Sequence, residues 1–163
     1  MSKGREVRCY DYVNHPYAQV RDVLGKDAPA IFQAATKSAN SRAQSIISEL
    51  RVDVGGIALE ADIVITVKKW EEPTAEMSGP STRLQLEWQA AKMPGLFPLM
   101  KAELVIYPLT ASETQLDFAG LYEPPLGVVG KALDAVVGYR IAEVSVHRFV
   151  NDVAGYLRQA LSN

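Results

Sequence analysis

The sequence predicts one α+β domain over residues 1–163, in which an antiparallel sheet packs against a long C-terminal helix. Two observations lead to this fold class. Apolar and polar residues alternate with a period of two through much of residues 45–122, which is typical of strands with one buried face. From residue 126 to the C-terminus the chain contains no proline, and residues 142–161 carry apolar side chains at helical spacing.

One strand and two short helices open the predicted fold. Residues 6–13 mix apolar and polar positions as a strand does, and Pro16 then marks the start of a helix that ends near Gly25. A second short helix is expected over residues 28–39, because Pro29 fits the first turn of a helix. The sequence therefore predicts two separate helices between the first strand and the rest of the sheet.

Five more strands are expected to follow as an antiparallel meander. The clearest alternation lies at residues 45–54 and 59–67, and the glycines between these segments predict a hairpin. On the second segment, Ile65 and Val67 share the apolar face. The remaining strands are expected at residues 83–88, 101–109 and 114–122.

Three segments carry a likeness to a known superfamily: "VNHPYAQVRDVL" after the first strand, "GLYEPPLG" before the last helix, and "YRIAEVSVHRFVNDVAGYL" within it. Together with the order of elements, they resemble the START-like, helix-grip superfamily, which includes polyketide cyclase-like and lipid-transfer proteins. The resemblance covers nearly the whole chain. It implies a curved antiparallel sheet wrapped around the C-terminal helix, with a cavity between them that receives apolar ligands, and the strand segments above predict six strands for this sheet. None of the segments is a catalytic motif, and such a fold does not decide the chemistry.

Composition and charge narrow the classes of partner. The formal net charge is −2, which disfavours a surface for nucleic acid. Cys9 is the only cysteine, and the N-terminus lacks the apolar core of a signal peptide, so a cytoplasmic protein is expected. No apolar run approaches the roughly 18 to 20 residues that span a bilayer. His15 and His147 are the only histidines and have no cysteine or paired acid at ligand spacing, so no metal or other cofactor is predicted.

The inward faces of the predicted strands are almost wholly apolar, with Ser48, Trp88 and Tyr122 as the main polar groups. This favours binding over catalysis, because ligand cavities are apolar with a few placed polar groups. The loop over residues 90–100 carries large apolar side chains beside glycine and prolines, so it is expected either to cover the cavity or to cap the core. The predicted ligand-binding residues of the sheet and this loop are Ser48, Leu59, Ile63, Leu86, Trp88, Met93, Phe97, Ile106, Phe118 and Tyr122.

Acid–base chemistry has one candidate, Asp11 on the first strand. A carboxyl group facing the cavity could serve as a general acid or base, while a hydrogen bond at the strand end is the alternative. Glu143 and His147 lie four residues apart on the last helix, a spacing that predicts an ion pair facing solvent. No catalytic residue is therefore predicted.

Small and bulky residues change sides along the last helix. Its C-terminal half has a regular apolar stripe through Val146, Val150 and Val153, and alanines extend this stripe backwards. If the helix is straight, the alanines leave unfilled volume against the sheet, and they are predicted to line the cavity: Ala132, Ala135 and Ala142. The opposite stripe must be covered by other elements, form a membrane-facing surface, or form a homodimer face made of Leu133, Val137, Ile141 and Val144. A kink near Gly138 could instead turn that stripe inward.

The sequence thus predicts a domain that binds or transports a hydrophobic small molecule, such as a lipid, an isoprenoid or a polyketide. Two alternatives stay open. One is an enzyme of the polyketide cyclase/dehydrase type, and the other is a protein-interaction module that uses the bulky face of the last helix.

Overall fold

The structure, a computed structural model, describes residues 5–50, 53–54, 57–58, 63–71, 81–90, 100–122 and 135–162. Within these ranges, the side chains of residues 46–50, 53–54, 57–58, 63, 89–90 and 135–138 lie outside the description. The elements in chain order are β1 (Arg5–Val13), α1 (Tyr17–Leu50), β2 (Asp53–Val54), β3 (Ile57–Ala58), β4 (Ile63–Glu71), β5 (Thr82–Ala90), β6 (Met100–Thr110), β7 (Glu113–Tyr122) and α3 (Ala135–Leu161).

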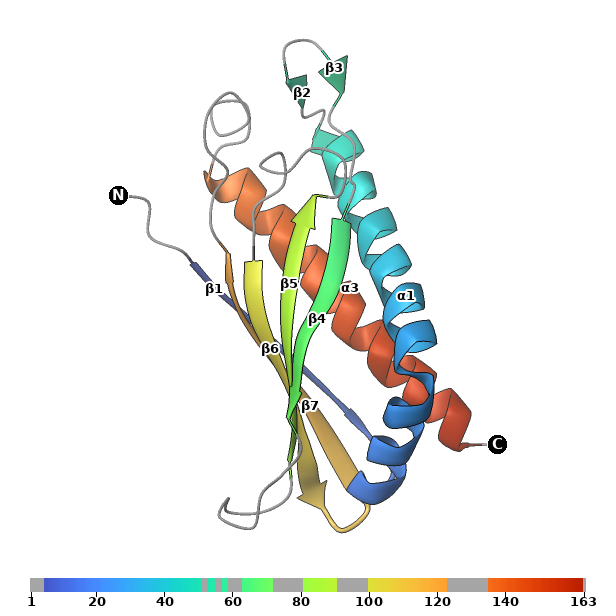
Figure 1. The fold of residues 1–163 in the computed structure, drawn as a ribbon. Helices are drawn as coiled ribbons and strands as arrows, with labels where there is room; N and C mark the ends of the chain where they lie inside the picture. Colours follow the sequence, from blue (N-terminus) through green and yellow to red (C-terminus); the bar gives the residue numbers. More distant parts are fainter. Residues whose placement is uncertain are drawn as a thin grey trace.

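Five strands form one antiparallel sheet in the order β1-β7-β6-β5-β4 (Figure 1). The predicted meander is confirmed for β4 to β7, and β1 returns to pair with β7, so that Arg5 lies opposite Tyr122. The expected six-strand sheet is not observed in the described ranges. In the described ranges the two-residue strands β2 and β3 pair with each other, Val54 opposite Ile57, and β4 pairs with β5, so the predicted hairpin of residues 45–54 with 59–67 is not formed.

The predicted helices are joined in one kinked helix, α1, of 34 residues. The kink lies at Asp27, whose φ of −114° and ψ of 15° are not helical. Pro29 explains it, because proline lacks a backbone N–H and its ring clashes with the carbonyl group one turn earlier. The kink falls where the sequence predicted a gap between helices.

The predicted strand at residues 45–54 is wrong over most of its length, because α1 continues to Leu50. Ala35, Ala39 and Ala43 recur every four residues and are at most 1% exposed. This spacing places the small side chains on one face of α1, where they allow a close approach to another helix. Helix packing therefore overrides the local alternation of apolar and polar residues.

Both helices lie on the same face of the sheet (Figure 1). They run beside each other, α3 over β1 and β7 and α1 over β4. The core fills the space between this helix pair and the sheet. Within the described ranges, neither helix has a stretch long and apolar enough to cross a lipid bilayer.

The inward faces of β5 and β7 agree with the prediction. Trp88 is 4% exposed and Tyr122 is 1% exposed, so both face the interior as predicted. Gly120 lies between Phe118 and Tyr122 on the same face. A Cβ atom there would lie 2.9 Å from Sδ of Met100, so a larger residue would require the Met100 side chain to move.

The C-terminal half of α3 is amphipathic as predicted, with Val146, Val150, Val153 and Leu157 fully buried. Ile141 corrects the prediction of an exposed homodimer face, because it is only 2% exposed, and Val144 also packs against the core. Helix α1 lies along α3, so α3 is covered on a second side besides the side that faces the sheet. The other expected members of that face, Leu133 and Val137, lie outside the described side chains. The backbone of α3 continues through Gly138 as one helix.

Candidate ligand-binding groove

A groove of about 500 Å³ opens between the middle of α1 and the edge strand β4. The helix packs mainly on α3, so its contact with β4 is sparse and leaves apolar side chains accessible on both elements. Two of them are Val64, 38% exposed, and Val67, 37% exposed. The residues that line the groove are Ala28, Pro29, Phe32, Gln33, Thr36, Val64, Ile65, Val67 and Trp70.

The lining of the groove is suited to holding an apolar molecule. Phe32, Ile65 and Trp70 supply aromatic and aliphatic surface. Thr36 donates its hydroxyl hydrogen to the carbonyl oxygen of Phe32 over 2.6 Å, so this group already has its partner within α1. Gln33 is exposed and offers an amide group. Among the described lining residues no side chain titrates near neutral pH, and this part of the molecule therefore offers binding without acid–base catalysis.

An irregularity in β4 places Trp70 in the groove. The pairing of β4 with β5 shifts between Val67 and Lys69, which marks a β-bulge. Without the bulge, strict alternation after Ile65 and Val67 would direct Lys69 to the inner face. The bulge reverses the phase, so that Lys69 is exposed and Trp70 packs against the core.

An aromatic cluster lies behind the groove. The ring of Phe32 stacks on Phe149 of α3, with centroids 6.0 Å apart. Phe149 meets the indole ring of Trp88 edge-on at 5.3 Å, and Trp88 in turn meets Phe118 edge-on at 5.9 Å. Trp88 is also the direct cross-strand partner of Ile65. Two lining residues, Phe32 and Ile65, thus separate the groove from Trp88.

The structure places the described members of the predicted site in the core. Leu86, Ile106 and Phe118 are at most 1% exposed, and Ala142 is 7% exposed. None of them lines the groove between α1 and β4. The backbones of Ser48 and Ala135 are in α1 and α3, and Ile63 pairs with Ala90, but these three side chains are not described. The remaining predicted residues lie outside the described ranges: Leu59, Met93, Phe97 and Ala132.

Sequence reasoning missed Phe32, Gln33 and Trp70 as lining residues. For Ile65 and Val67 the alternation of apolar and polar residues predicted a place on the inner face of the strand. Both line the groove. Phe32 falls within the helix that the sequence predicts over residues 28–39, and that pattern carries no signal for a binding role. Trp70 lies beyond the strand that the sequence predicts over residues 59–67, so the alternation gave it no place on either face.

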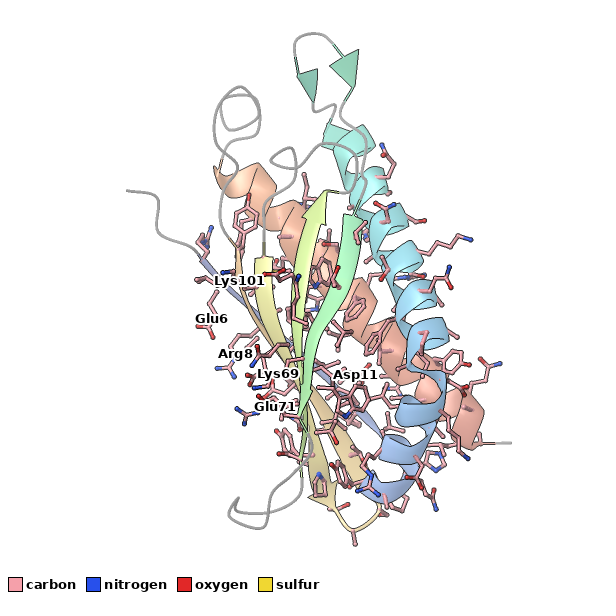
Figure 2. All side chains as sticks on the ribbon, in the orientation of Figure 1. Glu6, Arg8, Asp11, Lys69, Glu71 and Lys101 are labelled. Carbon is pink, nitrogen blue, oxygen red and sulfur yellow. The ribbon has the colours of Figure 1, made fainter. Side chains whose placement is uncertain are left out.

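A second hollow, of about 620 Å³, lies on the opposite face of the sheet. Figure 2 shows Glu6, Arg8 and Lys101 on this side, away from the helices. Lys68 forms an ion pair with Glu87 across the hollow, with Nζ 3.3 Å from Oε2. This hollow is larger than the groove, but charges of both signs line it. It is therefore less suitable for an apolar ligand.

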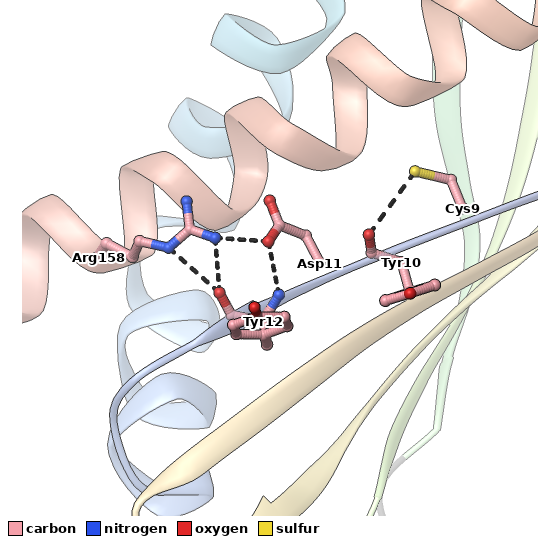
Figure 3. A network of polar contacts seen from close by, with 5 residues as sticks. All are labelled: Cys9, Tyr10, Asp11, Tyr12 and Arg158. Carbon is pink, nitrogen blue, oxygen red and sulfur yellow. Dashed lines mark hydrogen bonds and ion pairs between the residues drawn. The ribbon is translucent and has the colours of Figure 1, made fainter.

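Asp11 has a structural partner rather than a place in the groove. Its Oδ1 accepts hydrogen bonds from Nη2 of Arg158 over 2.5 Å and from the backbone N–H of Tyr12 over 2.7 Å (Figure 3). Arg158 also donates to the carbonyl oxygen of Tyr12 over 2.6 Å. These contacts join β1 to the last turns of α3. Of the two uses considered for Asp11, the structural hydrogen bond is the one observed.

Cys9 and His147 form the other notable polar contact. Sγ of Cys9 lies 3.5 Å from Nδ1 of His147, so the histidine contacts β1 instead of forming the predicted pair with Glu143. Burial raises the pKa of the Cys9 thiol from 9.0 to about 11, and the negative charges of Asp11 and Asp117 add to the shift. A thiol that stays protonated at neutral pH is a poor nucleophile. Within the described residues, no group of three His, Cys, Asp or Glu side chains is arranged to hold a metal ion.

Because the pKa of the Cys9 thiol is raised in the folded protein, we expect the free energy of unfolding to decrease in alkaline solution. The unfolded chain releases the thiol proton near pH 9 and the folded chain near pH 11. Between these values the unfolded state binds fewer protons, so the contribution of Cys9 is complete below pH 9 and declines by about 2 kcal/mol as the pH rises to about 11. Urea unfolding of the wild type and of Cys9→Ala should show this decline as a difference that shrinks between about pH 8 and pH 10.5. A difference that does not change with pH would contradict it.

Comparison with known proteins gives a likeness of fold only. No protein-family model matches the chain, and no curated protein matches it. A hypothetical protein from Helicobacter pylori is similar in structure with a TM-score of 0.51 at 11% identity, over 94% of this chain and 88% of that chain.

Two other solved structures show weaker likenesses. For the Zhui aromatase/cyclase from Streptomyces sp. R1128 the TM-score is 0.49 at 13% identity, over 97% of this chain and 96% of that chain. For a START superfamily protein from Mycobacterium smegmatis the TM-score is 0.46 at 11% identity, over 95% of this chain and 98% of that chain. Such scores carry no information on activity. The observed sheet order, with a long C-terminal helix packed on one face, agrees with the helix-grip fold that the sequence resemblance implied.

Proposed function

We propose that this protein binds a hydrophobic small molecule, of the size of a lipid, isoprenoid or polyketide, in the groove between α1 and β4. The observation that carries the proposal is the groove itself, a space of about 500 Å³ lined by Phe32, Ile65, Val67 and Trp70. Ligand sites in proteins typically measure about 300–1,000 Å³ and combine apolar walls with a few polar groups. The groove meets both conditions.

The exposure of the groove also supports binding. An edge strand with accessible apolar side chains is a risk for aggregation, and proteins usually cover or charge such edges. Lys68 and Lys69 supply charge to β4, yet Val64 and Val67 remain more than one third exposed. A bound apolar molecule would remove this surface from water, which is favourable by about 25 cal/mol for each Å².

The groove borders one residue of the site that the sequence predicted, Trp88. Ile65 lies opposite Trp88, Trp88 opposite Met100, and Met100 opposite Tyr122, in one row across four strands. Tyr122 packs against Tyr139 in the N-terminal part of α3, with ring centroids 6.3 Å apart. Binding in the cytoplasm, without a catalysed reaction, is the function that we infer.

Titration with a neutral, apolar fluorescent dye tests this function. We expect saturable binding of one dye molecule per chain, because the groove has room for one ligand of that size. Native mass spectrometry of freshly purified protein, followed by extraction into organic solvent, should then identify any retained natural ligand. Dye fluorescence that rises without saturation, or no rise at all, would contradict the proposal.

A further inference from the structure

The indole N–H of Trp88 is a buried hydrogen-bond donor for which the described part of the chain supplies no acceptor. Trp88 is 4% exposed, and its Nε1 atom is buried without a hydrogen-bond partner. Most buried polar groups in proteins are paired, and an unpaired one costs about 1–3 kcal/mol. The packing of the indole ring does not explain why its N–H is buried without a hydrogen-bond acceptor.

Trp88 lies directly behind the groove. It is the cross-strand partner of Ile65, and partners in a sheet place their Cβ atoms only about 5 Å apart. On the helix side, the ring of Phe149 contacts both Phe32 and Trp88, with ring centroids 6.0 Å and 5.3 Å apart. The side chains of Ile65 and Phe32 line the groove. A ligand that displaces Ile65 by a change of rotamer would therefore meet the indole ring.

We propose that Trp88 donates its Nε1–H to a carbonyl oxygen of the bound molecule, so that the ligand is an apolar compound with a ketone, aldehyde or ester group. This inference rests on the proposed function. A carbonyl oxygen suits the site because it accepts a hydrogen bond and brings no donor of its own. A carboxylate would bury a charge, and no cation lies among the described lining residues to compensate it. A hydroxyl group would bring a donor that needs a further acceptor.

Two probes of equal chain length test the proposal, a long-chain methyl ketone and the corresponding alkane. Wild-type protein should bind the ketone about tenfold more tightly than the alkane, the factor expected for one buried hydrogen bond. Trp88→Phe keeps an aromatic ring but removes the donor. In this variant the ketone oxygen would be buried without a donor, so the ratio of the two affinities should fall to one or below. The ratio is decisive, because a loss of packing weakens both probes alike.

Nuclear magnetic resonance provides a second readout that needs no change at Trp88. The chain has two tryptophans, so the wild type gives two indole N–H signals, which Trp70→Phe would assign. The Trp88 signal should move downfield when the ketone is added and should stay nearly unchanged with the alkane. If both probes bind equally and the signal does not respond to the ketone, the proposal for Trp88 is wrong while the groove remains a ligand site. If neither probe binds, the proposed function fails, and the role of Trp88 fails with it.

Discussion

Phe149→Ala is expected to lower the free energy of unfolding by about 4 kcal/mol, the largest effect of any single change considered for this chain. Phe149 is fully buried where α1, α3 and the sheet meet. Its ring contacts Phe32 of α1, Trp88 of β5 and Phe118 of β7, with centroids 5.3–6.5 Å apart. Truncation would remove these contacts and leave a cavity that three separate elements cannot easily close.

Urea unfolding monitored by circular dichroism measures this effect. Tyr10→Ala is a suitable control, because Tyr10 is an aromatic residue of the same sheet but is 66% exposed. The control should change stability by about 0.5 kcal/mol or less. If Phe149→Ala cost no more than the control, the packing of both helices on one face of the sheet would be in doubt.

Val67→Glu is expected to weaken binding of the neutral apolar dye by about tenfold or more. Val67 lines the groove and is 37% exposed, so the strand can carry a charged side chain there without loss of the fold. A ligand in the groove would have to strip water from the carboxylate, which is costly when no cation compensates the charge. The loss should appear in the dissociation constant, while the urea unfolding midpoint changes little.

Leu109→Glu is the matched control for this change. Leu109 is also an apolar strand residue, 49% exposed, but it lies on β6 and does not line the groove. It introduces the same charge into the same sheet, so non-specific repulsion of the dye would affect both variants equally. Equal weakening by Val67→Glu and Leu109→Glu would argue against the groove as the binding site.

The fold was predictable from the sequence where one periodicity dominates. Strict alternation along β6 and β7 predicted their inner faces, and Phe118 and Tyr122 are buried as expected. Pro29 likewise predicted the interruption of α1. These features depend on a few neighbouring residues, so the sequence expresses them directly.

The errors arose where distant packing decides the structure. Residues 46–50 alternate like a strand, but α1 continues through them because the alanines before them favour contact with α3. For the stripe that contains Ile141, the sequence left open cover by another element, a dimer face and a membrane-facing surface, because the presence of α1 beside α3 could not be inferred from the spacing within α3. The bulge after Val67 depends on the pairing of β4 with β5, so the place of Trp70 was also hidden.

Photoaffinity labelling tests the central claim, that the groove between α1 and β4 holds the apolar ligand, most directly. A long-chain methyl ketone with a diazirine group would be crosslinked to the protein by light, and tryptic peptides would be analysed by mass spectrometry. Cleavage after lysine and arginine yields the peptides 27–37, 52–68 and 70–83, which between them contain every described residue of the groove. We predict that peptides 27–37 and 52–68 carry most of the label and lose it in Val67→Glu. Label concentrated instead on peptides of β6, β7 or the C-terminal half of α3, and unchanged in Val67→Glu, would contradict the claim.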